Sequence, residues 1–166
     1  DATLFCQRLL AGGIDGAEDM AYQGVERNSL LEFYSHTAVP MLSLAARQHA
    51  RGATVVQRQH LIEGTTRIVQ ELQVEDSTLV TKETALAAAT PGDRPAPDAK
   101  LFLCVGLRTE LEALSAVMLA HAFTATGQPA QALLLESASR TNSNYFDAAK
   151  AVHRIYLCTF SATPHT

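Results

Sequence analysis

The hydrophobic residues of this chain change their spacing once, and this change limits the possible folds more than any other feature. Up to residue 72 they recur at the three- and four-residue intervals of amphipathic helices. From residue 101 they form short continuous runs, which is typical of strands in a parallel sheet. Three prolines lie between the two patterns and indicate an extended linker. We therefore predict a helical subdomain over 1–90, a linker over 91–99 and a small parallel α/β subdomain over 100–166.

The first half contains several helix-start signals. Asp15 with Glu18, Ser29 with Glu32, and Thr54 with Gln57 have the spacing of N-terminal capping pairs. Pro40 falls inside the third helical pattern, where it should kink the helix or divide it. Residues 77–80 are compatible with a short strand, followed by a short helix over 84–89. The main expected helices cover 3–10, 15–27, 29–51 and 54–72.

The second half alternates between strand and helix patterns. Apolar runs predict strands over 101–106, 132–135 and 155–160. Thr109 and Glu112 should cap one intervening helix, which Gly127 ends, and a second helix is expected over 144–153. This order with short connections predicts a three-stranded, right-handed parallel sheet of Rossmann-like βαβαβ type. The expected fold class is therefore α/β, with an N-terminal helical bundle.

Composition narrows the possible partners. The net charge is -4 without a basic cluster, which argues against nucleic acid as a partner. The chain has no run of about 20 apolar residues of the kind that spans a bilayer. Cys6, Cys104 and Cys158 lack the spacing of a disulfide framework or zinc site, and they point to a reducing compartment. Because the chain begins with Asp1 rather than methionine, we expect it to be a piece of a longer protein.

Motifs that carry catalysis are missing from the sequence. It has no G-x-G-x-x-G, no Walker-type phosphate loop and no G-x-S-x-G elbow. The six histidines form neither H-x-x-x-H nor H-E-x-x-H, and a structural role is favoured for His121. We therefore predict no catalytic residue, no metal ligand and no cofactor.

One place in the predicted fold favours a ligand. Parallel sheets bind ligands at the carboxyl ends of their strands, near helix N-termini. The polar residues at these ends are Arg108, Thr109 and Glu110 after the first strand, and Arg140, Thr141 and Asn142 after the second. An arginine beside a helix N-terminus suits an anionic ligand. The alternative is that these residues only cap helices, form turns or lie in solvent.

A helical segment followed by a small parallel α/β unit resembles the cobalamin-binding regions of methyltransferases and light-sensing regulators. That family carries D-x-H-x-x-G after the first strand, and its histidine ligates cobalt. Here the loop contains Gly106, Leu107, Arg108, Thr109 and Glu110, without the aspartate or the histidine. The resemblance therefore implies the layout of the fold, and a corrin-like ligand would bind without this cobalt ligand.

Most of residues 4–160 also resembles the carboxyl-terminal region of some bacterial autoinducer-2 exporter (permease-like) transporters. The segments Leu31-Glu32-Phe33-Tyr34 and Pro40-Met41-Leu42-Ser43-Leu44-Ala45 are similar to an "L-E-F-Y … P-A-L-x-L-A" helix of that family. Leu103-Cys104-Val105, Glu110-Leu111-Glu112 and Met118-Leu119-Ala120 are similar to its "L-C-V … L-D-E … M-L-A" segment. The resemblance implies an appendage on the cytoplasmic side of the inner membrane.

Two functions remain in view. The first is a non-catalytic regulatory or interaction module whose partner is the transmembrane portion of its parent protein. A small sheet with two open edges also favours a homodimer. The second is a sensor that binds an anionic or corrin-like small molecule at the strand carboxyl ends.

Overall fold

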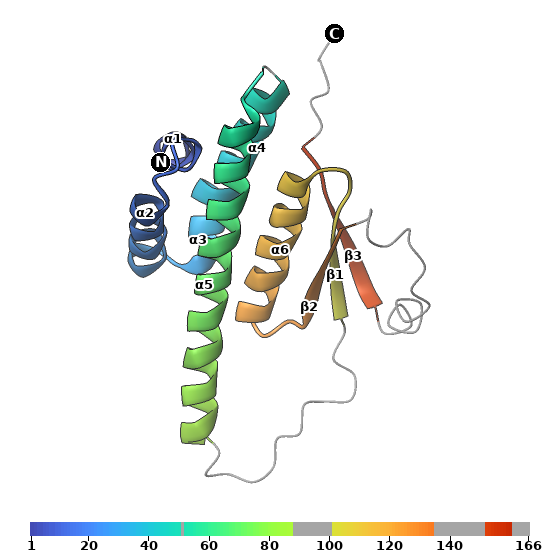
Figure 1. Cartoon of the computed structure of the whole chain (residues 1–166). Helices are drawn as coiled ribbons and strands as arrows, with labels where there is room; N and C mark the ends of the chain where they lie inside the picture. The colour runs from blue at the N-terminus through green and yellow to red at the C-terminus, as the bar shows by residue number, and fades with distance from the viewer. Residues whose placement is uncertain (51, 88–100, 135–151, 161–166) are drawn as a thin grey trace.

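The computed structural model describes residues 1–50, 52–87, 101–134 and 152–160. It is an α/β fold with a helical N-terminal part, as the sequence predicts (Figure 1). The helical part comprises α1 (Ala2–Leu10), α2 (Ile14–Arg27), α3 (Leu30–Phe33), the π-helix η1 (Tyr34–Ala38), α4 (Val39–Ala50) and α5 (Val55–Ala87). The α/β part comprises β1 (Leu101–Gly106), α6 (Glu110–Ala125), β2 (Ala130–Leu134) and β3 (Val152–Cys158).

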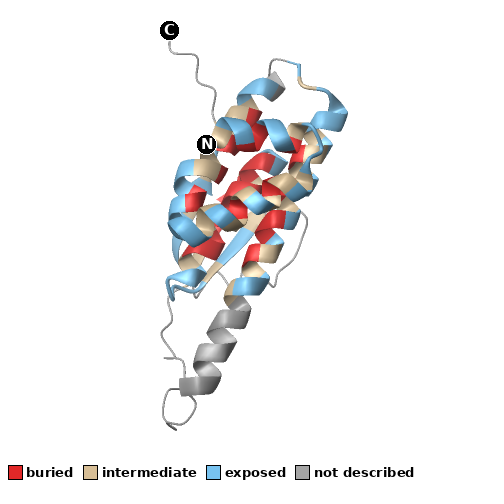
Figure 2. Ribbon diagram, turned by 90° about the vertical axis from the view of Figure 1, so that its left-hand side faces the viewer, coloured by how far each residue is buried: buried red, intermediate tan, exposed pale blue. Residues whose placement is uncertain are grey.

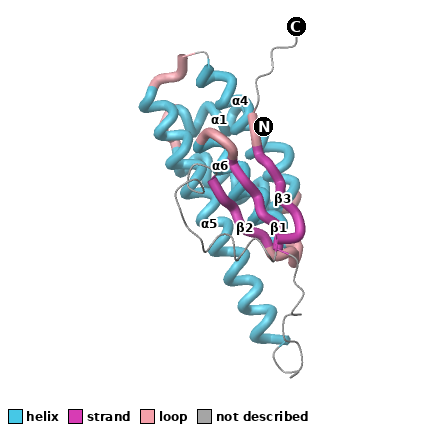
Figure 3. Tube along the Cα trace, turned by 90° about the vertical axis from the view of Figure 1, so that its right-hand side faces the viewer, coloured by secondary structure: helices cyan, strands magenta, loops and turns pink. Residues whose placement is uncertain are grey.

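The three strands form one parallel sheet in the order β2-β1-β3. Helix α6 connects β1 to β2 and covers one face, where Cys104 packs with Ala116 and Ala120. Because side chains alternate along a strand, Ile155 and Leu157 of β3 belong to the opposite face. Figure 3 shows the sheet from this side, with the helices behind it.

A single hydrophobic core joins the helical part to α6. Its buried side chains come from α1 to α5 and include Phe5, Leu9, Met41 and Leu61. Helix α6 adds four more, which are Leu111, Leu114, Met118 and Ala122. Figure 1 shows α6 between the long helix α5 and the sheet. Figure 2 shows the buried residues gathered in the interior of the molecule. The proline-rich linker therefore separates two sequence patterns that share one core.

Most predicted helix starts are confirmed, and one is wrong. Ser29 accepts a hydrogen bond from the Glu32 amide, and Thr54 forms a reciprocal pair with Gln57. The Asp15–Glu18 prediction is wrong, because α2 begins at Ile14 with Gly13 as its cap. The Glu18 side chain contacts Arg67 of α5 instead.

Pro40 widens its helix without ending it. The turn before it is the π-helix η1, in which the Val39 amide bonds the Tyr34 carbonyl five residues earlier. Proline lacks an amide hydrogen and its ring collides with the carbonyl four residues back, so a wider turn relieves the conflict. The helical path continues directly into α4.

Three predicted boundaries need correction. Residues 77–80 are helical, because α5 continues without a break to Ala87, so the short-strand prediction is wrong. Its 33 residues also include the first part of the short helix expected over 84–89. Strand β3 begins at Val152, so His153 lies in a strand rather than at the end of a helix. The remainder of that predicted helix lies outside the described residues.

Gly106 allows α6 to start directly above the end of β1. A Cβ atom there would lie 2.5 Å from the Ala113 amide nitrogen and 2.6 Å from the Ala113 Cα. Backbone atoms inside a helix cannot move aside as a flexible side chain can. The close approach of strand and helix therefore requires glycine at this position.

We predict that Gly106→Ala destabilises the protein by about 1–3 kcal/mol or more, because it overpacks a backbone contact. The control is Gly16→Ala, whose new methyl group meets only the exposed end of the Arg8 side chain. Urea unfolding of both variants measures the difference. Equal stability of Gly106→Ala and the wild type would contradict this account of the strand–helix crossing.

Candidate functional site

The three described residues predicted to bind a ligand line one cleft. Arg108, Thr109 and Glu110 lie in the β1–α6 loop and at the start of α6, at the carboxyl end of β1. The opposite wall is the first part of α5, and the cleft measures about 650 Å³. The residues of that wall are Val55, Arg58, Gln59, Ile62 and Glu63. The other candidates, Arg140, Thr141 and Asn142, lie outside the described residues.

The cleft contains charges of both signs. Arg58 Nη2 lies 2.9 Å from Glu110 Oε2 and links α5 to α6 across the cleft, with side chains that are 41% and 59% exposed. Arg108 is exposed, and its guanidinium has no partner among the described residues. Since surface ion pairs contribute at most about 1 kcal/mol, the Arg58–Glu110 pair can open for a ligand at little cost.

The N-terminus of α6 already holds an anion of its own, the carboxylate of Glu112. Glu112 Oε2 accepts the backbone N–H groups of Arg108 at 2.7 Å and Thr109 at 3.1 Å. Thr109 returns the bond by accepting the Glu112 amide, so the predicted capping box is confirmed. Two amides that would receive an external anion are therefore satisfied internally.

The second oxygen of Glu112 joins the loop to the end of β3. Glu112 Oε1 accepts the Phe160 N–H at 3.0 Å and the Thr159 hydroxyl at 3.2 Å. Burial raises the pKa of this carboxyl, but the backbone donors of Phe160, Arg108 and Thr109 and the Thr159 hydroxyl outweigh that effect and lower it. The ionised side chain thus connects the carboxyl ends of β1 and β3.

A second buried polar group joins the two parts of the chain. His121 of α6 lies with Nε2 2.9 Å from Asp76 Oδ2 and with Nδ1 2.8 Å from the Tyr34 hydroxyl. Because Asp76 accepts, Nε2 carries the proton and the Tyr34 hydroxyl donates to Nδ1. Burial lowers the pKa of His121 despite the opposing effect of Asp76. The ring is therefore neutral, and its two hydrogen bonds link α6 to η1 and to α5.

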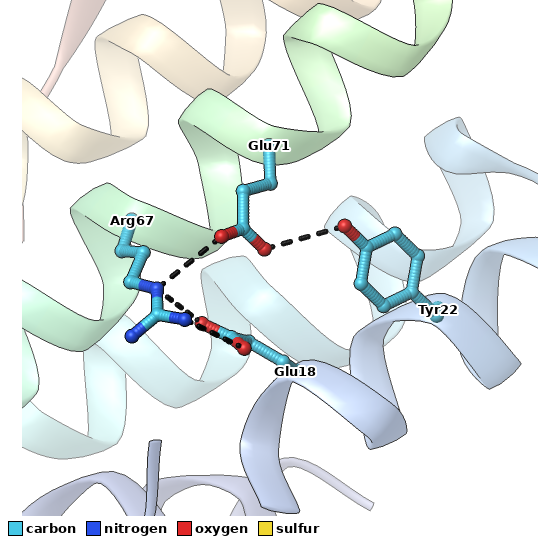
Figure 4. A network of polar contacts seen from close by, with 4 residues as sticks. All are labelled: Glu18, Tyr22, Arg67 and Glu71. Atoms are coloured by element: carbon cyan, nitrogen blue, oxygen red, sulfur yellow. Dashed lines mark hydrogen bonds and ion pairs between the residues drawn. The ribbon is translucent and has the colours of Figure 1, made fainter. Parts of the chain in front are cut away.

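Figure 4 shows a further polar network, between α2 and α5. Arg67 Nε lies 2.7 Å from Glu18 Oε1 and 3.2 Å from Glu71 Oε1. The Tyr22 hydroxyl donates to the other Glu71 oxygen at 3.2 Å. Burial and the neighbouring Glu71 raise the pKa of Glu18 in spite of Arg67. One arginine thus pairs with two carboxylates where the helices meet, which is a structural arrangement.

The three cysteines are free thiols, of which Cys6 and Cys104 are buried and Cys158 is half-buried. Burial raises the pKa of Cys104 to about 11, which leaves a neutral, unreactive thiol at ordinary pH. Among the described residues, no group of three or more histidine, cysteine or acidic side chains is arranged to hold a metal ion.

Sequence reasoning identified one side of the cleft and missed the other. Arg108, Thr109 and Glu110 followed from the rule that strand carboxyl ends bind ligands. The α5 wall has no motif, and its approach depends on packing that spans more than 50 residues of sequence. The sequence did not predict the contact of His121 with Tyr34 and Asp76. Its one indication in the sequence was that His121, a polar residue, lies beside the apolar positions of α6.

We predict that Glu112→Gln destabilises the protein by about 2–4 kcal/mol, since an amide cannot accept at both ends and leaves buried donors unpaired. Glu110→Gln is the matched control on the same helix turn, because its side chain is exposed and its one ion pair is weak. Urea unfolding at neutral pH compares them. The account is wrong if both variants lose the same small amount.

The same measurement has a pH dependence with a defined sign. The pKa of Glu112 in the folded protein lies below its ordinary value of 4.5. Its contribution to stability is therefore complete above pH 4.5 and is lost as the pH falls through the folded pKa. The stability gap between wild type and Glu112→Gln should narrow across that acidic range.

Comparisons with protein-family models, curated proteins and solved structures returned no significant match for this chain. Within the described ranges, no helix has both the length and the apolar character needed to cross a bilayer.

Proposed function

We propose that this chain is a non-catalytic regulatory and interaction module. The main support for the proposal is that the side-chain contact most similar to a catalytic site, Tyr34–His121–Asp76, has its hydroxyl buried. The order of hydroxyl, imidazole and carboxylate matches that of a nucleophile, its base and an orienting acid. However, Tyr34 is only 3% exposed, burial and the nearby Asp76 raise its pKa well above the ordinary value, and it does not line the cleft. A buried, protonated hydroxyl cannot reach a substrate.

The proposed setting is the cytoplasmic side of a bacterial inner membrane. This part of the proposal rests on the resemblance of residues 4–160 to the carboxyl-terminal region of permease-like exporters. The partner would be the transmembrane portion of the same parent protein.

The cleft favours a second candidate function, the sensing of a small ligand. Its walls come from α5 of the helical part and from the β1–α6 loop of the α/β part. A ligand bound between them would contact both parts at once, which is a means of coupling binding to their arrangement. Arg108 is the free cation of the cleft among the described residues, so the ligand class we propose is anionic. A corrin-like ligand is the alternative that the resemblance of the fold layout to cobalamin-binding regions implies.

We expect at least one member of a panel of cobalamins, nucleotides and simple anions to raise the melting temperature of the protein. At about 100 times its dissociation constant, a ligand stabilises by roughly 2.7 kcal/mol. Arg108→Ala should remove this shift, because it deletes the unpaired charge. Arg47→Ala, an exposed arginine on α4, is the control that should keep it. A shift unchanged in Arg108→Ala would exclude this cleft.

We further propose that β3 mediates homodimerisation by pairing with a second copy. Strand β3 lies at one edge of the sheet, with no neighbour on its outer side among the described residues. Ile155 and Leu157 are 61% and 63% exposed on it. An exposed apolar edge is open to association, and two such edges can pair about a two-fold axis.

Ile155→Lys should therefore shift the protein from dimer to monomer, because a charged side chain on an edge strand opposes pairing. Sedimentation velocity at micromolar concentrations measures the species present. Val56→Lys is the control, since Val56 is also 59% exposed but lies on α5. A wild-type protein that sediments as a monomer would overturn the dimer without affecting the ligand-sensing proposal.

A further inference from the structure

A second cavity lies at the opposite end of the sheet from the candidate cleft. It measures about 500 Å³, is partly open to solvent and lies between α5, α6 and β2 near the start of β2. Figure 1 shows these three elements side by side, with α6 in the middle. The volume is within the usual range of roughly 300–1,000 Å³ for small-molecule sites.

The wall of this cavity is mostly apolar and made of small side chains. Its apolar residues are Val117, Ala120, Ala125, Ala130 and Ala132. Alanines at these positions leave space where larger residues would fill the gap between α6 and β2. The wall therefore suits the apolar body of a small ligand.

The polar part of the wall has a net negative charge. Asp76 and His121 both line the cavity, and no lysine or arginine among the described residues does so. Asp76 uses Oδ2 to accept His121 Nε2–H, while its other oxygen accepts no hydrogen bond from the described residues. Tyr34, which does not line the cavity, hydrogen-bonds the other ring nitrogen of His121, Nδ1. The histidine therefore orients the carboxylate.

The Asp76 side chain is 37% exposed, so its carboxylate is accessible to a ligand, and an ammonium group can form a charge-assisted hydrogen bond with it. We propose that this cavity is a binding site for small organic cations, specifically amines with an apolar body. The ammonium group donates to the Asp76 oxygen that accepts no hydrogen bond from the described residues, and the apolar body contacts the alanines of α6 and β2. This site is independent of the proposed cleft, because the two share no lining residue.

Three probes of similar shape test this proposal, which are benzylamine, benzyl alcohol and benzoate. Binding is measured by titration with amide chemical-shift mapping of the whole chain. Benzylamine should perturb the amides of residues 117–125 and 130–132, and should bind roughly tenfold or more tightly than the alcohol, because its hydrogen bond is charge-assisted. Benzoate should not bind there.

Asp76→Asn should remove the preference for benzylamine over benzyl alcohol, while its amide oxygen still accepts His121 Nε2–H and preserves the fold. Glu75→Gln is the matched control, one residue away, exposed and outside the cavity wall. Ala132→Leu, which fills the cavity, should weaken both neutral and cationic probes. The proposal is overturned if no probe perturbs these amides, if the three bind equally, or if Asp76→Asn keeps the amine preference.

Discussion

Helix α6 is buried on two sides, and both parts of the molecule depend on it. Leu111, Leu114 and Met118 contribute to the core of the helical part, whereas Ala116 and Ala120 pack against the sheet. A helix that is apolar around its circumference cannot remain stable at a surface, so it requires neighbours on both faces. The sheet and the helical bundle supply one each. Without the bundle, the outer face of α6 would be exposed to water.

Because α6 is buried on two sides, its polar side chains also need hydrogen-bond partners within the protein. Glu112 and His121 are buried with the helix, and each has its hydrogen bonds completed by other parts of the chain. Glu112 takes donors from the β1–α6 loop and from the end of β3, and His121 takes partners from η1 and α5. Losing either set would leave an unpaired buried group, which is costly. These contacts therefore fix the position of α6 along its axis as well as its depth.

Much of the fold could be predicted from the sequence because its local signals agree with its tertiary structure. The Thr109–Glu112 capping box and the apolar run of β1 each specified their element. Local signals failed where tertiary packing decided. Residues 77–80 have strand-like composition but extend α5, and Asp15 has the spacing of a cap although the helix begins before it. The π-turn at Tyr34 follows from Pro40 only once the helix is known to continue.

The candidate sites divide in the same way. The loop side of the cleft follows from a general rule about parallel sheets, so Arg108, Thr109 and Glu110 could be named in advance. The α5 side, and the contact of Asp76 with His121, unite residues 45 or more positions apart. No local pattern encodes such pairs. Their geometry depends on how α6 lies against α5, which is a property of the shared core.

Native-state hydrogen exchange of the whole chain tests this dependence most directly. If α6 unites the two parts, the slowest amides of α1, α4, β1 and α6 should exchange with one common opening free energy, equal to that of global unfolding. A set of β1 and α6 amides that stays protected after the amides of α1 and α4 have opened would contradict the account, because the α/β part would then be stable without the helical part.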